Sequence, residues 1–187
     1  MKIDSPLPDL SVRAFFSSLV MPLVRHDCVH CQFVSGGGKR RIIQYLLHRQ
    51  DLLKEILGSA YDTYIFVYVN PDEIEETTAN SYIKLMRQRL VYTLEKLHCS
   101  VPYTVAGLSE LEIIKQLLHI LTKKGYSIAF LLNDFEFTLS LPISIYLNLE
   151  AIMAVNKSHI TYAFLSSINT FHEDFISRMG NLKYAVS

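Results

Sequence analysis

Two short stretches of the sequence contain residue types that could hold a phosphorylated ligand. The first is SGGGKRR, residues 35 to 41, in which three glycines precede Lys39. Glycines can take the positive φ values that turn several backbone N–H groups toward one anion, and the lysine adds a mobile cation. The second is NDFEF, residues 133 to 137, whose acids are Asp134 and Glu136. Such carboxylates can hold Mg²⁺ through water or orient an attacking water.

The glycine stretch departs from the usual phosphate-binding loop. The pattern G-x-x-x-x-G-K-[ST] would require a glycine at Phe33 and a hydroxyl at Arg40. The side chain that binds Mg²⁺ in such loops is therefore missing, although a guanidinium at position 40 can pair with phosphate oxygens. The candidate nucleotide-binding residues are Ser35, Gly36, Gly37, Gly38, Lys39, Arg40 and Arg41.

Each stretch also has a purely structural interpretation. Glycine-rich turns between a strand and a helix can serve close packing alone. An aspartate after a strand commonly caps a helix or lies in a solvated turn. The candidate catalytic residues are Asp134 and Glu136, and no metal ligand is assigned with certainty.

The patterns around these stretches predict strands that alternate with helices. Apolar runs rich in β-branched and aromatic residues predict strands at 27–34, 63–69, 126–132, 159–165 and 182–186. Helical spacing of apolar residues predicts helices at 11–24, 39–57, 80–97, 109–124, 143–155 and 171–178. Pro22 should end or kink the first helix, and Ser109 with Glu112 forms a predicted capping box. We therefore expect an α/β fold, a three-layer α-β-α sandwich with a mostly parallel five-stranded sheet.

Composition narrows the class of protein. The chain has 187 residues and fits a single domain, 1–187, with 18 basic and 18 acidic residues. This balance argues against a generally basic nucleic-acid surface. The apolar run AFFSSLVMPLV is too short to span a bilayer, so we expect a cytoplasmic protein with no membrane partner.

The cysteines do not indicate a disulfide framework, because three is an odd number in a chain without a secretory signal. His26, Cys28, His30 and Cys31 lie close together in the sequence and suggest a zinc site. In a strand, however, Cys28 and Cys31 project to opposite faces, and no second ligand pair follows. Two buried cysteines are the favoured interpretation.

The order of strand, GGGK loop, helix and apolar strands, the third of which ends in D-F-E, resembles the AAA+ and STAND classes of P-loop ATPases, in particular the archaeal origin-recognition-like ATPases. The resemblance covers nearly all 187 residues by the order of elements and two short segments by motif. The resemblance implies a sheet ordered 5-1-4-3-2 and ATP or ADP bound between Lys39 and the acids. In the better register, Asn133 falls on the family's magnesium-linked aspartate and Asp134 on its catalytic glutamate. One residue later, Asp134 becomes the magnesium acid, and Glu136 is an imperfect substitute for the catalytic glutamate. Both the Walker A and the Walker B motifs are thus altered.

Four further residues match the family more loosely. Ser166 and Ser167, with Asn169 close behind, fall where the family senses the γ-phosphate, and turn chemistry is their alternative interpretation. Arg178 lies where the family carries an arginine finger, although a lone surface arginine is more often a solvated charge.

The resulting hypothesis is an ATP-binding domain with slow or lost hydrolysis that acts as a nucleotide-dependent switch. The alternative is a protein-interaction module that keeps the fold and no longer binds nucleotide. A protein partner or self-association is expected, and DNA binding would involve a lid or effector region outside this sequence. Magnesium is an expected but weakly supported cofactor, because Arg40 and Asn133 replace both of its direct protein supports.

Overall fold

The core of the fold is a parallel sheet. The structure, a computed structural model, describes residues 9–34, 37–103, 105–167 and 178. Its strands are β1 (Val29–Gln32), β2 (Tyr64–Val69), β3 (Ser127–Leu132) and β4 (Ile160–Ser166). They are hydrogen-bonded in the order β1-β4-β3-β2, and every neighbouring pair is parallel. The order of these four strands is the one that the resemblance implied.

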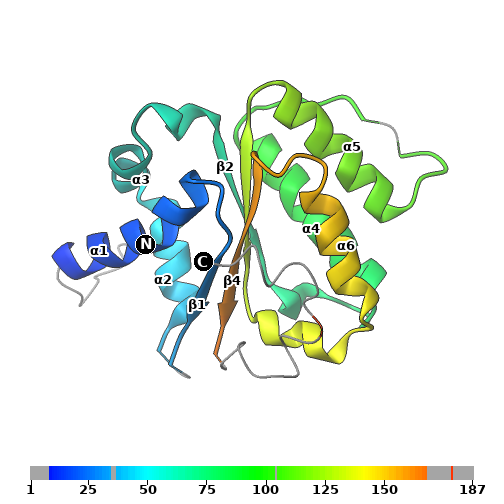
Figure 1. The fold of residues 1–187 in the computed structure, drawn as a ribbon, viewed down its shortest axis with the longest axis horizontal. Helices are drawn as coiled ribbons and strands as arrows, with labels where there is room; N and C mark the ends of the chain where they lie inside the picture. The colour runs from blue at the N-terminus through cyan, green and yellow to red at the C-terminus, as the bar shows by residue number, and fades with distance from the viewer. Residues whose placement is uncertain (1–8, 35–36, 104, 168–177, 179–187) are drawn as a thin grey trace.

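Helices cover both faces of this sheet (Figure 1). The helices are α1 (Asp9–Val24), α2 (Lys39–His48), α3 (Gln50–Leu57), α4 (Ala79–Lys96), α5 (Glu110–Lys123) and α6 (Ser144–Met153). Short 3-10 turns follow three of the elements: η1 (Gly58–Thr63), η2 (Pro71–Glu73) and η3 (Phe135–Ser140). One hydrophobic cluster joins α1, α2 and α3 to the sheet, and a second joins α4, α5 and α6 to its other face. The predicted three-layer sandwich is therefore present.

The central strand β3 explains why the strands read as continuous apolar runs. Ile128, Phe130 and Leu132 pack toward α4, α5 and α6. Ala129 and Leu131 point to the opposite face and pack with α1, α2 and α3. Because successive side chains of a strand alternate between faces, a sheet covered on both sides needs an apolar residue at nearly every position.

The predicted helix at 39–57 is wrong as a single element, because it is broken into α2 and α3 at Arg49. The backbone of Arg49 has φ −86° and ψ 68°, outside the helical region, and its N–H donates to the carbonyls of Tyr45 and Leu46. Its guanidinium donates to the Asp51 carboxylate and to the Tyr45 hydroxyl, which holds the bend. No glycine or proline lies at this break, and the helical spacing of apolar residues continues through it. The sequence therefore predicts one uninterrupted helix.

Two other expectations are corrected or left open. Pro22 does not end the first helix, because α1 continues to Val24. Within the described residues, the sheet has four strands and not the five that the sequence predicted. The fifth predicted strand, 182–186, lies outside the described residues. The same is true of the predicted helix at 171–178, of which only residue 178 is described. No helix in the described part of the chain combines the length and the apolar character needed to cross a membrane.

The capping box of α5 gives a test of the fold. The Ser109 hydroxyl accepts from the Glu112 N–H, and the Glu112 carboxylate accepts from the Ser109 N–H at 2.8 Å. We expect Ser109→Ala to lower the free energy of unfolding by about 1 kcal/mol, because a helix N–H loses its partner. For a chain of this size the melting temperature should fall by about 2–4 °C.

Ser100→Ala is the matched control, since Ser100 is exposed and lies in the connection between α4 and α5, outside either helix. Equal melting temperatures for the two variants would show that the capping box does not stabilise the domain.

Candidate phosphate-binding site

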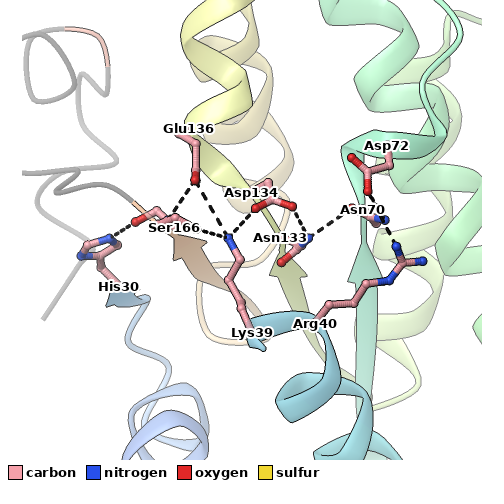
Figure 2. Close-up of polar contacts among 10 residues, drawn as sticks. His30, Lys39, Arg40, Asn70, Asp72, Asn133, Asp134, Glu136 and Ser166 are labelled. Carbon is pink, nitrogen blue, oxygen red and sulfur yellow. Dashed lines mark hydrogen bonds and ion pairs between the residues drawn. The ribbon is translucent and has the colours of Figure 1, made fainter. Parts of the chain in front are cut away.

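The polar residues predicted to act together lie where the carboxyl ends of the parallel strands meet (Figure 2). Lys39 begins the helix after β1, Asn133 and Asp134 follow β3, and Ser166 ends β4. The chain leaves β1 for β2 at the far edge of the sheet and returns through β3 to β4. The strand order therefore reverses between β1 and β4, and crevices of this kind are where open α/β sheets bind ligands.

Lys39 is the centre of the site. Its side chain is only 9% exposed, and its Nζ lies 2.5 Å from Asp134 Oδ1. The same ammonium donates to Ser167 Oγ at 3.1 Å and lies 4.0 Å from Glu136 Oε1. A buried lysine is costly unless it is paired, so the acids after β3 and the hydroxyl after β4 meet a requirement of the fold. The predicted approach of Lys39 to Asp134 and Glu136 is present.

The backbone at the start of α2 presents free donors. Gly38 has φ +74°, the helix has no side-chain cap, and its first turn contains no acid. The first helical hydrogen bond runs from the Ile42 N–H to the Gly38 carbonyl. Among the described residues, the N–H groups of 39, 40 and 41 therefore have no partner, as expected of the first turn of a helix. An uncapped N-terminus of this kind attracts an anion through its N–H groups and its partial positive charge.

Gly37 shows why a side chain does not fit in this loop. Its N–H donates to the Val34 carbonyl at 2.9 Å. A Cβ built at Gly37 would lie 2.9 Å from that same carbonyl oxygen, closer than real Cβ atoms approach. Ser35 and Gly36, the other predicted members of the loop, lie outside the described residues.

Asn133 links the ends of β3 and β2. It is 2% exposed, and its amide Nδ2 donates to Asn70 Oδ1 at 3.1 Å and to Asp134 Oδ2 at 2.6 Å. Its backbone N–H donates to the Val69 carbonyl and extends the β2–β3 ladder by one bond. Its Oδ1 is buried and makes no hydrogen bond. A buried acceptor without a donor is uncommon, and an ion is one explanation of it.

Glu136 has a similar arrangement on the side of β4. Its Oε1 accepts from the Ser167 N–H at 2.9 Å, whereas its Oε2 is buried without a hydrogen-bond partner. The unpartnered oxygens of Asn133 and Glu136, together with the Asp134 carboxylate, are hard oxygen donors of the type that Mg²⁺ prefers. No group of three or more His, Cys, Asp or Glu side chains in the described residues could hold a metal alone. The chemistry of these oxygens suits a magnesium ion whose other ligands would be phosphate oxygens and water.

The backbone of Asp134 is unusual for a residue other than glycine. It has φ 45° and ψ 48° in the left-handed region, where β3 ends and η3 begins. Its side chain nevertheless points back toward Lys39 (Figure 2). Sparsely populated backbone conformations of this kind often occur in functional sites.

The contacts described for the predicted arginines do not involve Lys39. Arg40 is exposed and turns toward the end of β2, where its Nη1 lies 3.7 Å from Asp72 Oδ2 (Figure 2). An exposed pair at that distance contributes little stability. Arg41 is exposed on α2, and Arg178 Nη1 donates to the Leu139 carbonyl at 3.0 Å. Asn169 lies outside the described residues.

His30 belongs to the site, although its sequence context had suggested zinc. Its Nε2 lies 2.8 Å from the Oγ of Ser166, which is fully buried at the end of β4 (Figure 2). Burial lowers the pKa of His30 below its usual value, and the nearby charge of Glu136 opposes this shift. The histidine is therefore an uncharged hydrogen-bond partner of Ser166 near neutral pH.

Asn70 and Asp72 belong to this network, although neither is among the site residues predicted from the sequence. The signal was present, since Asn70 directly follows a buried parallel strand whose carboxyl end must lie at the same sheet edge as Asn133. Asn70 is buried and donates from Nδ2 to Asp72 at 3.3 Å. These residues connect the network around Lys39 to Arg40.

The cysteines agree in part with the structural interpretation, because Cys28 is buried and Cys31 is half-buried. Cys28 packs into the cluster on the side of α4 to α6, whereas Cys31 packs against the opposite cluster. Burial raises the pKa of each thiol to about 11, and neither cysteine forms a disulfide with a described residue. The described residues thus hold no zinc-type cluster at this position.

Comparison with known proteins identifies similar folds. No protein-family model matches the sequence, and no curated protein sequence matches it. Among solved structures, the chain is similar to the Aeropyrum pernix ORC2 protein in ADPNP–ADP complexes, with a TM-score of 0.65 and 13% identity over 100% of this chain and 48% of that one. It is also similar to the A. pernix ORC1 protein in complex with DNA, with a TM-score of 0.60 and 19% identity over 94% and 43% of the two chains. Cdc6p from Pyrobaculum aerophilum has a TM-score of 0.58 and 17% identity over 99% and 46%.

The chain therefore spans less than half the length of each of these proteins. At such low identity the likeness concerns the backbone and not individual side chains. The α/β fold of this chain, with its parallel sheet, is therefore similar to part of the fold of these ORC and Cdc6 structures.

Proposed function

We propose that this chain is a nucleotide-binding domain that takes the phosphates of ATP or ADP at the start of α2. Lys39 carries the proposal, because a buried ammonium lies beside an uncapped helix N-terminus and opposite two carboxylates. Two of the similar structures are described as ADPNP–ADP and ADP forms of A. pernix ORC2, which supports an adenine nucleotide.

Binding requires an exchange of partners at Lys39. In the structure its ammonium is paired with Asp134, and a bound phosphate would need the same ammonium. The freed carboxylate would then face the phosphate oxygens, and like charges at this distance repel unless a cation separates them. Asp134 and the unpartnered oxygens of Asn133 and Glu136 are the groups that would receive Mg²⁺. The ion would neutralise phosphate charge, and these residues would fix its position.

We propose that hydrolysis is slow or lost. The amide of Asn133 stands where the resemblance expects the magnesium-linked aspartate, and Arg40 stands where a hydroxyl would hold the ion. The Arg40 side chain lies toward Asp72 and not beside Lys39. Neutralisation by the metal is much of what phosphoryl transfer requires, so weak metal support lowers the rate more than it lowers binding.

The network around Asp134 supports a role as a nucleotide-dependent switch. Asp134 joins Lys39 on one side and the Asn133 amide on the other, and Asn133 joins Asn70 after β2. A phosphate that takes Lys39 from Asp134 therefore biases contacts at the ends of three strands. A protein partner or DNA would read that change through regions outside this chain, and the DNA-bound form of A. pernix ORC1 supports DNA as a candidate.

The first test is a melting curve with and without MgATP. At a nucleotide concentration of 100 times Kd, binding should add about 2.7 kcal/mol of stability. For a domain of this size that corresponds to a rise of about 5–10 °C. Lys39→Ala should abolish the rise in melting temperature, because Lys39 is the only buried cation among the described residues of the site.

Lys84→Ala is the matched control, since Lys84 is an exposed lysine on α4. Each variant is compared with its own nucleotide-free curve, because Lys39→Ala also leaves the half-buried acids Asp134 and Glu136 without their cation. A rise that persists in Lys39→Ala would contradict the proposed site. No rise in any condition would favour the alternative, an interaction module that has lost the ligand.

The second test restores a carboxylate at the metal position. Asn133→Asp removes the amide donor to Asn70 and to Asp134 and adds a negative charge beside Asp134. In EDTA we expect a loss of about 1–3 kcal/mol, because a buried acceptor loses its donor and like charges meet. MgATP should then stabilise this variant more than the parent and raise ATP turnover, since the ion gains a direct ligand.

Asn80→Asp, on the exposed side of α4, controls for the added charge. Equal magnesium dependence of the parent and Asn133→Asp would place the ion elsewhere. Ordinary ATP turnover in the parent, lost in Lys39→Ala, would disprove the loss of hydrolysis and leave the binding site intact.

A further inference from the structure

The strand β2 is an uncovered edge of the sheet within the described residues, because it pairs only with β3. In Figure 1 it runs between α3 on one side and α4 on the other. A groove of about 690 Å³ follows this edge, and Lys39 is not among the residues that line it. Proteins usually cover or block such edges, since the unpaired backbone groups can pair with another chain.

The direction of the backbone groups along β2 follows from one hydrogen bond. The Val69 carbonyl accepts from the Asn133 N–H, so the backbone groups of Val69 point toward β3. Alternate residues of a strand point their backbone groups to opposite sides, so Phe66 and Tyr68 direct theirs into the groove. No hydrogen bond in the described part of the chain uses these groups, whereas the Tyr64 N–H is taken by the Tyr61 carbonyl.

Apolar and aromatic side chains line both walls of the groove. Leu53 and Tyr61 come from the side of α3, and Tyr92 and Leu97 come from α4. Tyr92 is 46% exposed and Leu97 is 56% exposed, which is unusual for side chains of this size. Two apolar walls on either side of a free strand edge match the alternating side chains of an extended peptide.

The charges of the groove favour one acidic group and not a polyanion. Lys96 forms no ion pair with a described residue, and its Nζ lies 4.5 Å from the centre of the Tyr92 ring. Arg89 is already paired with Glu73, and Asp62 adds a negative charge on the opposite wall. Binding of nucleic acid depends on several cations that neutralise phosphates, whereas Lys96 is the one lysine or arginine lining this groove that forms no ion pair with a described residue.

We infer that the groove along β2 binds an extended segment of a partner protein, which adds a strand to the sheet through the backbone groups of Phe66 and Tyr68. The segment carries alternating apolar side chains and one acidic side chain that pairs with Lys96. This surface is distinct from the proposed nucleotide site, because neither Lys39 nor the acids after β3 line the groove.

The test selects peptides of about ten residues from a random phage-displayed library on the intact chain, a length that covers one strand. Selected peptides should alternate in apolar character and contain an acid. Their binding should slow hydrogen exchange at the amides of Phe66 and Tyr68. Lys96→Glu should weaken them about fivefold to tenfold, the value of one polar contact.

Phe66→Pro and Phe66→Ala form a matched pair. Both remove the ring, but only proline removes the outward N–H, and an edge strand tolerates proline at such a position. Phe66→Pro should bind about fivefold to tenfold more weakly than Phe66→Ala. Melting curves check whether both variants fold. If the proline variant is unfolded, Lys96→Glu still tests the proposal.

Three outcomes would overturn the proposal. In the first, the library would yield no peptide that protects these amides from hydrogen exchange. In the second, the selected peptides would bind the proline and alanine variants equally. In the third, an oligothymidylate would protect the amides in place of a peptide. The last result would assign the groove to single-stranded nucleic acid.

Discussion

The burial of a paired lysine is the constraint on which the candidate site depends. Removing either acid partner would leave Lys39 as an undercompensated charge in a desolvated place, which is far more costly than losing a surface ion pair. The ammonium therefore fixes how far the turns after β3 and β4 can move from the start of α2. The parallel register brings these turns to one level, because Leu132 of β3 pairs with Phe164, and Ser166 of β4 pairs with Gln32 of β1.

The same constraint explains why the residues around Lys39 form a network. Ser167 supplies a hydroxyl to the lysine and a backbone N–H to Glu136, so one turn serves both charges. His30 supports the neighbouring Ser166 from the edge strand β1. The buried amides of Asn133 and Asn70 extend the network to β2. Polar groups in such a place stabilise the fold only when they are satisfied together, so the two oxygens left without donors stand out.

Much of the fold could be predicted from the sequence, because the patterns that indicate its strands and helices are local. Period and length identified the four described strands, and the Ser109–Glu112 pair marked the start of α5. The approach of Lys39 to Asp134 followed from topology, since the carboxyl ends of parallel strands meet at one edge. The Arg49 break was not readable, because a pair between Arg49 and Asp51 sets it and no glycine or proline marks it. The direction of Arg40 and the amide pair between Asn70 and Asn133 depend on neighbours that only the folded chain brings together.

The left-handed backbone of Asp134 has a consequence for how this domain could be re-engineered. A longer acid at this position would have to adopt φ 45°, a region that short residues such as aspartate and asparagine tolerate better than glutamate. The turn therefore selects the length of the acid before any chemistry is considered. Replacing Asp134 with glutamate, as the resemblance would suggest for a faster ATPase, works against the backbone that holds it. Active-site grafting onto this scaffold must begin with the path of the chain between β3 and η3, and only then with its side chains.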